Sequence, residues 1–172
     1  MRSLWPPEAH VITLPWETPM DDTQMMVLEL GSQGYTCAQI VVAGGLRLMG
    51  RENPDLIRSM GGLAQGVGCS GEICGALAGG SCLIAMHTAK GMDMEEDLPE
   101  AQMLTSSLVD WFREEQCAGG GVTCDAIMGT DGSGPRTMDA VRCGGLVAAV
   151  WNKAVAMLVE SGIDPTLGRE LP

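Results

Sequence analysis

A glycine-rich stretch in the middle of the chain, GCSGEICGALAGG at residues 68–80, constrains the fold more than any other feature. Its glycines Gly71, Gly75 and Gly79 are four residues apart, so on an α-helix they fall on one face. Each glycine costs about 1 kcal/mol in a helix relative to alanine. A face without side chains lets another helix, or a bound group, approach the backbone closely. Tight helix packing and space for a bulky group beside a thiol both explain the pattern.

The rest of the sequence is typical of a small all-α protein. Its 172 residues suit one domain, and only 3% of them are aromatic, so the core must use Leu, Val, Ile, Ala and Met. No alternating strand pattern of convincing length is present. We therefore expect a compact bundle of about five helices with a Gly-rich central helix. We assign residues 1–22 to an irregular N-terminal arm and residues 23–172 to a single helical, cysteine-rich domain.

Capping signals place several of the expected helices. Asn53 followed by Pro54 is a strong start signal, and Thr36 and Thr123 are further N-cap candidates. The expected helical segments are residues 37–50, 53–66, 71–91, 98–116 and about 137–160, with a short helical turn after Thr123.

The charge of the chain restricts its partners. It has 22 acidic and 10 basic residues, a formal net charge of −12. Such a field repels phosphate backbones and anionic membranes, so we expect no nucleic-acid or membrane partner and favour basic proteins or metal cations. We see no targeting segment, and the longest apolar stretch is too short to span a bilayer. A cytoplasmic location is therefore expected.

Seven cysteines are the main candidates for chemistry. A disulfide framework is not expected in a reducing cytoplasm, which leaves metal binding or redox chemistry as the leading explanation. The chain has no CxxC pair, so zinc ribbons, thioredoxin-like centres and ferredoxin-type clusters are poorly supported. If several thiols cooperate, they must come from different helices and meet in three dimensions.

Four of the cysteines lie at informative positions. Cys37, Cys74 and Cys124 are at or near the starts of expected helices, and Cys143 is in the first part of the last one. Helix N-termini carry partial positive charge, so we expect them to depress the pKa of nearby thiols and favour the metal-binding thiolate. Cys82 is eight residues after Cys74, about 12 Å along a helix, and is expected to be a core residue.

These residues carry a resemblance to a known family. CGALAG (74–79) matches the CGAxxG core of the C_GCAxxG_C_C family of redox-active proteins. YTCAQIVVAGG, VTCDAIMG and AVRCGGLVAAVWN resemble the segments that carry its other cysteines, so the resemblance covers roughly residues 30–160. It implies a small helical protein associated with oxidoreductase systems. A related domain of split-Soret cytochromes is linked to an iron–sulfur cluster and a dimeric protein.

By this resemblance the candidate ligands of an iron–sulfur cluster are Cys37, Cys74, Cys124 and Cys143. The Gly71, Gly75 and Gly79 face would leave space for the cluster. Cys69, Cys82 and Cys117 are additional to the family pattern, so Cys69 or Cys117 could replace one of the four.

Three functions remain open. The first is a cluster-binding redox protein that passes electrons to a redox partner protein, as an electron carrier rather than a stand-alone enzyme, with a homodimer as a further expectation. The second is a metal-free protein in which two cysteines cycle between thiol and disulfide. The third is a non-catalytic helical accessory protein whose cysteines are packing residues and whose acidic surface binds a partner.

Overall fold

The computed structural model describes residues 20–118, 120–130 and 139–169, and this part of the chain is mostly helical without strands. It contains seven α-helices instead of about five, and the expected all-α class is confirmed. The elements are α1 (Asp22–Ser32), α2 (Cys37–Leu48), α3 (Pro54–Met60), the 3₁₀ turn η1 (Gly61–Leu63), α4 (Gly75–Thr88), α5 (Ala101–Trp111), the π-helical turn η2 (Phe112–Gln116), α6 (Cys124–Met128) and α7 (Ala140–Glu160).

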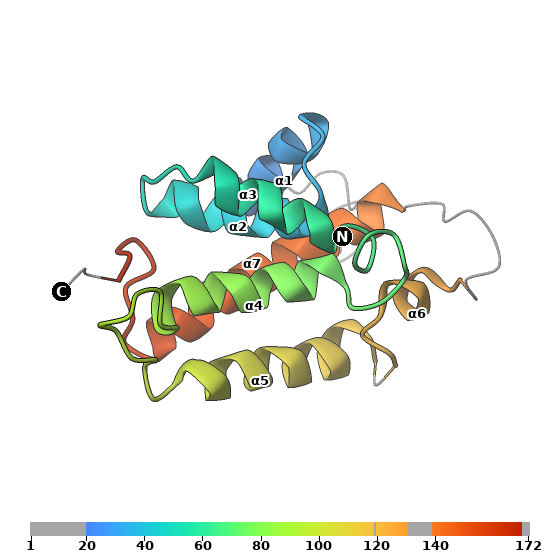
Figure 1. Ribbon diagram of the computed structural model, residues 1–172. Helices are drawn as coiled ribbons and strands as arrows, with labels where there is room; N and C mark the ends of the chain where they lie inside the picture. The colour runs from blue at the N-terminus through green and yellow to red at the C-terminus, as the bar shows by residue number, and fades with distance from the viewer. Residues whose placement is uncertain (1–19, 119, 131–138, 170–172) are drawn as a thin grey trace, which may run out of the picture.

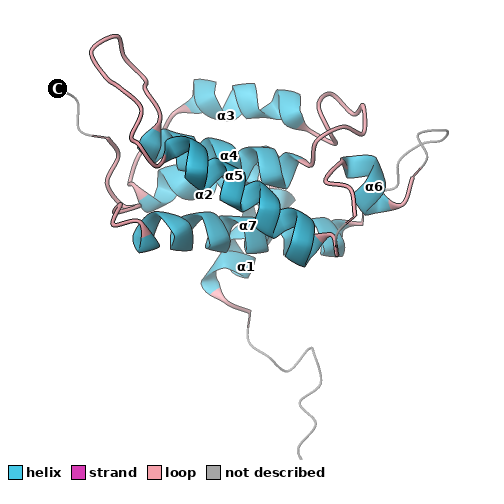
Figure 2. Cartoon of the chain, turned by 90° about the horizontal axis from the view of Figure 1, so that it is seen from below, coloured by secondary structure: helices cyan, strands magenta, loops and turns pink. Residues whose placement is uncertain are grey.

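Three of the long helices point in the same direction. Helices α2, α4 and α7 run in the same direction and begin at the same end of the bundle, beside the short α6, whereas α5 runs the opposite way (Figure 1). Figure 2 shows α6 set to one side of the longer helices in a second view. Because a helix N-terminus carries partial positive charge, three long helices direct that charge towards one end of the molecule.

The predicted N-caps at Thr36, Asn53 and Thr123 are confirmed. The Asn53 side chain accepts a hydrogen bond from the Leu56 N–H at 3.0 Å, and the Thr123 hydroxyl accepts one from the Ala126 N–H at 3.2 Å. Each bond satisfies a backbone donor that has no partner within its helix. These local signals fix where α2, α3 and α6 begin.

Several expected boundaries differ from the structure. The segment expected as a helix over 53–66 is helical only to residue 63, and the segment 71–91 becomes helical at Gly75. Residues 1–19 of the expected arm lie outside the described residues, and α1 begins at Asp22, in a part of the chain for which we expected no specific helix. The late start of α4 follows from Ile73, which pairs with Thr123 in an isolated antiparallel bridge and holds the chain extended there.

Helix α4 packs against α2, α5 and α7. A Cβ on Gly79 would lie 2.9 Å from the Cα of Ala38, so the missing side chain lets α2 approach the backbone of α4. Gly80 does the same towards Leu108 of α5 and Val150 of α7. Gly71 precedes the helix at a φ of +82°, so the expected helical face of Gly71, Gly75 and Gly79 is wrong at its first member.

Helix α7 is long and apolar enough, by length and composition, to cross a membrane, and no other helix among the described residues is. It packs against α1, α2, α4 and α5, which is the environment of a core helix. Its residues Val150, Ala154 and Leu158 are fully buried in the bundle. We therefore interpret α7 as part of the protein core, and the cytoplasmic location stays a prediction.

Candidate functional site

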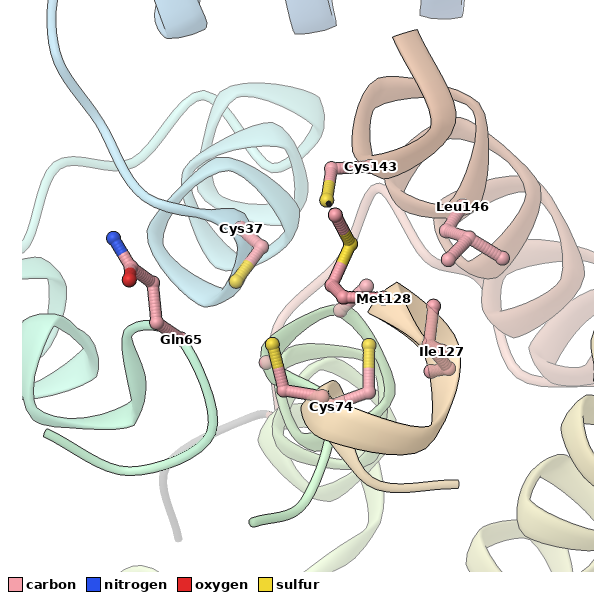
Figure 3. Close-up of a pocket in the computed structure, with 10 residues that line it drawn as sticks. Cys37, Gln65, Cys74, Ile127, Met128, Cys143 and Leu146 are labelled. Atoms are coloured by element: carbon pink, nitrogen blue, oxygen red, sulfur yellow. Dashed lines mark hydrogen bonds between the residues drawn. The ribbon is translucent and has the colours of Figure 1, made fainter. Parts of the chain in front are cut away.

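The four cysteines selected from the sequence line one cavity at the end of the bundle where α2, α4 and α7 begin. Cys37 is the first residue of α2, Cys74 is the N-cap of α4, Cys124 is the first residue of α6, and Cys143 lies in the first turn of α7. Figure 3 shows the sulfurs of Cys37, Cys74 and Cys143 directed towards a common space. The cavity has about 20 Å³ of free space, which is room for about one water molecule.

Two of these cysteines are brought together by the isolated bridge between Ile73 and Thr123. The Cys74 N–H donates to the Val122 carbonyl at 3.0 Å, and the Cys124 N–H donates to the Glu72 carbonyl at 2.6 Å. In an antiparallel pair, residues that directly follow the paired positions lie on the same face, about 7–8 Å apart diagonally. The bridge therefore places both side chains on the cavity side before each chain segment turns into its helix.

Gly75 makes room for the thiol of Cys37. A Cβ on Gly75 would overlap the Cys37 sulfur and would also lie 2.9 Å from the carbonyl oxygen of Leu63. Gly75 is one of the residues that line the cavity, whereas Gly71 and Gly79 are not. The expectation that a glycine leaves space beside a thiol therefore has a structural counterpart at Gly75, and Gly79 serves the packing of α2 on α4.

Burial dominates the electrostatics of these thiols. It raises the pKa of Cys74 to about 11, although the backbone N–H groups of Ala76 and Leu77 at the start of α4 act in the opposite direction. Burial also raises the pKa of Cys143, and the neighbouring Cys37 and Cys124 add to this rise. The expectation that a helix N-terminus depresses the pKa is therefore wrong for Cys74, because desolvation of its thiolate outweighs the N–H groups.

The raised pKa predicts slow alkylation of Cys74 in the metal-free protein. At pH 8, a thiol with a pKa of about 11 has roughly 100-fold less thiolate than one with a pKa of 9. We expect iodoacetamide to modify the exposed Cys69 well before the buried Cys74, as measured by mass spectrometry of timed digests. Modification of Cys74 first would contradict the burial of its thiol.

The same shift has a consequence for stability. The folded-state pKa of Cys74 lies above the ordinary value of 9.0. The contribution of this thiol to the free energy of unfolding is therefore fully present below pH 9. Between pH 9 and 11 the unfolded chain loses this proton while the folded chain keeps it. The free energy of unfolding should therefore fall by about 1 kcal/mol per pH unit in this window, and urea denaturation at a series of pH values checks it.

Sequence reasoning missed several residues of the cavity, namely Gln65, Ala76, Ile127, Met128 and Leu146. The Met128 sulfur is 3.9 Å from the Cys143 sulfur, so a thioether adjoins the thiols. Met128 follows Cys124 by four residues, the spacing that puts two side chains on one helix face, and this signal could have found it. Gln65 belongs to a turn with positive φ at Gln65, Val67 and Cys69, for which the sequence carries no comparable signal.

The remaining cysteines do not line the cavity. Cys69 is exposed, and Cys82 and Cys117 are partly buried elsewhere in the fold. Within the described ranges, no group of three or more His, Cys, Asp or Glu side chains is arranged to hold a metal ion, so the four thiols share a cavity without a preset coordination geometry.

Fold and site together define a helical protein in which thiols from separate helices surround one buried cavity. The chain belongs to the family described as "Putative redox-active protein (C_GCAxxG_C_C)", whose model matches residues 35–157 and so includes all four cavity cysteines. The resemblance seen in the sequence is thereby confirmed, and membership supports a redox role. No curated protein and no solved structure matches the chain.

Proposed function

We propose that the protein binds an iron–sulfur cluster through Cys37, Cys74, Cys124 and Cys143 and exchanges single electrons with a partner oxidoreductase. The observation that carries the proposal is that all four side chains line one cavity although they come from four helices. Thiolates are the usual ligands of iron–sulfur clusters, and four are the usual number. Such a cluster would supply one-electron chemistry that the thiols alone do not perform readily.

The residues around the thiols are chemically suited to hold an iron–sulfur cluster. Ile127 and Leu146 line the cavity with apolar surface, which limits access of water to it. The N–H groups of Ala76 and Leu77 favour the anionic form of Cys74, the form that a metal requires. The free space of about 20 Å³ is what remains with four thiol side chains in place, so binding requires these side chains to rotate.

Binding of the metal must displace protons from the thiols. Because burial raises the pKa values of Cys74 and Cys143, both are protonated at neutral pH in the metal-free protein. Apparent metal affinity should therefore rise with pH, since each ligand gives up a proton. Gly75 is the glycine that retains a role in this proposal, since a side chain there would occupy the position of the Cys37 sulfur.

A metal-free thiol–disulfide function is the second candidate, and one observation favours it. The bridge between Ile73 and Thr123 places Cys74 and Cys124 on one face of a two-stranded contact. Oxidation of this pair to a disulfide would release two electrons and two protons to a partner disulfide, which would become two thiols. Diagonal neighbours in a regular antiparallel pair are about 7–8 Å apart, longer than the usual Cα separation of a disulfide, so at that spacing the backbone would have to move.

Anaerobic purification, an absorption spectrum and analysis of iron and acid-labile sulfide test the first function against the second. We expect broad visible absorption together with iron and sulfide. A colourless protein that remains free of iron after anaerobic reconstitution would exclude the cluster. If that colourless protein also gains two titratable thiols on treatment with dithiothreitol, the thiol–disulfide function is supported instead.

A further inference from the structure

We propose that the partner oxidoreductase docks in a surface groove between α1 and the first turns of α2 and α7. The partner would bind through an apolar patch of its own that is surrounded by basic residues. The inference rests on the proposed electron-transfer function and specifies where and with what surface the partner binds. The groove, termed here the α1–α7 groove, is defined by its lining residues Val27, Leu28, Cys37, Ile40, Cys143 and Val147 together with their neighbours.

The α1–α7 groove adjoins the thiol cavity directly. Cys37, Gln65 and Cys143 line both the groove and the cavity, so these three side chains form the wall between them. A side chain of the partner seated in the groove would contact two of the four thiols from outside. One electron would leave this protein and reduce the cofactor of the partner by one electron, and no atom or proton would be transferred.

The groove has the surface of a contact site rather than of ordinary solvent-exposed protein. The described residues that line it include no Asp, Glu, Lys, Arg or His, and most are apolar. Leu28, on its α1 side, keeps 60% of its surface exposed, and Val141, which follows the lining residue Ala140, keeps 88%. Apolar surface without charge at its centre is the composition of protein interface cores.

A second copy of this chain and a basic redox protein are the two candidate occupants of the groove, and their charge distinguishes them. A second copy of this chain would bring a net charge of −12 against a net charge of −12, which opposes association at moderate ionic strength. A partner with basic residues around its apolar patch is attracted by the same field, and attraction of this kind accelerates encounter between redox proteins. The occupant that fits both the groove and the charge is therefore a basic redox protein.

The acidic connection between α4 and α5, residues 92–100, is an alternative binding site for a basic protein. It follows the C-terminal end of α4, whereas Cys74 and the cavity are at the N-terminal end. A basic protein bound at residues 92–100 would thus be separated from the thiols by the length of α4. The two locations give different predictions and can be distinguished by mapping.

Reduced cytochrome c, a basic and diamagnetic redox protein, serves as the probe. Titrated at low salt into the ¹⁵N-labelled, metal-free full chain, it should shift amide signals of α1 and of the first turns of α2 and α7. The variant Leu28→Gln should weaken binding about fivefold or more, because it places an amide in the apolar patch. Val159→Gln, which changes a residue of similar exposure near the other end of α7, should leave binding unchanged.

Four outcomes would overturn the docking proposal. These are no binding at low salt, signal changes centred on residues 92–100, equal effects of Leu28→Gln and Val159→Gln, and a dimer in sedimentation that Leu28→Gln dissociates. Because the titration uses metal-free protein, its result is independent of the cluster. If the protein binds the probe in the groove but never takes up iron, the cluster proposal is wrong and the docking proposal stands. If the protein takes up iron but binds the probe elsewhere, the docking proposal is wrong and the cluster proposal stands.

Discussion

Replacing Cys74 with alanine should lower the iron bound per protein by about tenfold or more after anaerobic reconstitution. Cys74 is 8% exposed, lines the cavity, and is positioned by the hydrogen bond from its own N–H to the Val122 carbonyl. Its loss leaves three thiols at the cavity and fills the position of the fourth with a methyl group that cannot bind iron. Iron analysis and visible absorption measure the effect.

Cys82→Ala is the matched control for this variant. Cys82 lies in the same helix, eight residues further on, and does not line the cavity. Its alanine variant should keep the iron content and the colour of the unmodified protein. Circular dichroism of both variants separates loss of a ligand from loss of the fold. Equal losses of iron in two folded variants would show that the cavity is not the metal site.

Local signals in the sequence located two of the cavity cysteines, Cys37 and Cys124, and the resemblance to the family supplied the full set of four. Thr36 and Thr123 mark the starts of α2 and α6, and the cysteine that follows each of them is therefore at a helix N-terminus. Because α2, α4 and α7 all begin at one end of the bundle, cysteines near helix starts also become neighbours in space. The caps depend only on residues three positions apart, which is why they could be predicted.

The remaining features depend on contacts between distant segments. The bridge between Ile73 and Thr123 joins residues 50 positions apart, and it delays the start of α4 to Gly75. Neither residue carries a signal for this pairing in its own neighbourhood. The turn that brings Gln65 to the cavity requires positive φ at Val67, a conformation that a β-branched residue rarely adopts, so sequence preference opposes it.

The pKa of the Cys74 thiol could likewise be predicted only in part from the sequence. The helix N-terminus at Cys74 was visible in the sequence and does act on the thiol, through the N–H groups of Ala76 and Leu77. The larger influence is burial, which depends on the helices packed around Cys74. A group at a helix start can therefore have a depressed or a raised pKa, and the sign is decided by solvent exposure.

Replacing Gly79 with alanine should destabilise the protein by about 1–3 kcal/mol, although alanine is the better helix former. A Cβ at this position would lie 2.9 Å from the Cα and 3.1 Å from the carbonyl oxygen of Ala38. Both atoms belong to the backbone of α2, so they cannot rotate away and α2 itself must shift. Because Cys37 is the neighbour of Ala38, the shift should also reduce iron binding. Urea denaturation of the metal-free protein measures the change in stability.

Gly145→Ala provides the matched control, because it makes the same chemical change in helix α7 where, among the described residues, no atom outside the neighbouring helix backbone lies within 4 Å of the added Cβ. This variant should be more stable by about 0.5–1 kcal/mol, since alanine lowers the conformational entropy of the unfolded chain and suits a helix. The opposite signs of the two substitutions separate close packing from helix propensity. If Gly79→Ala is as stable as Gly145→Ala, the α2–α4 contact is looser than the structure shows, and Gly79 does not set the position of the Cys37 thiol.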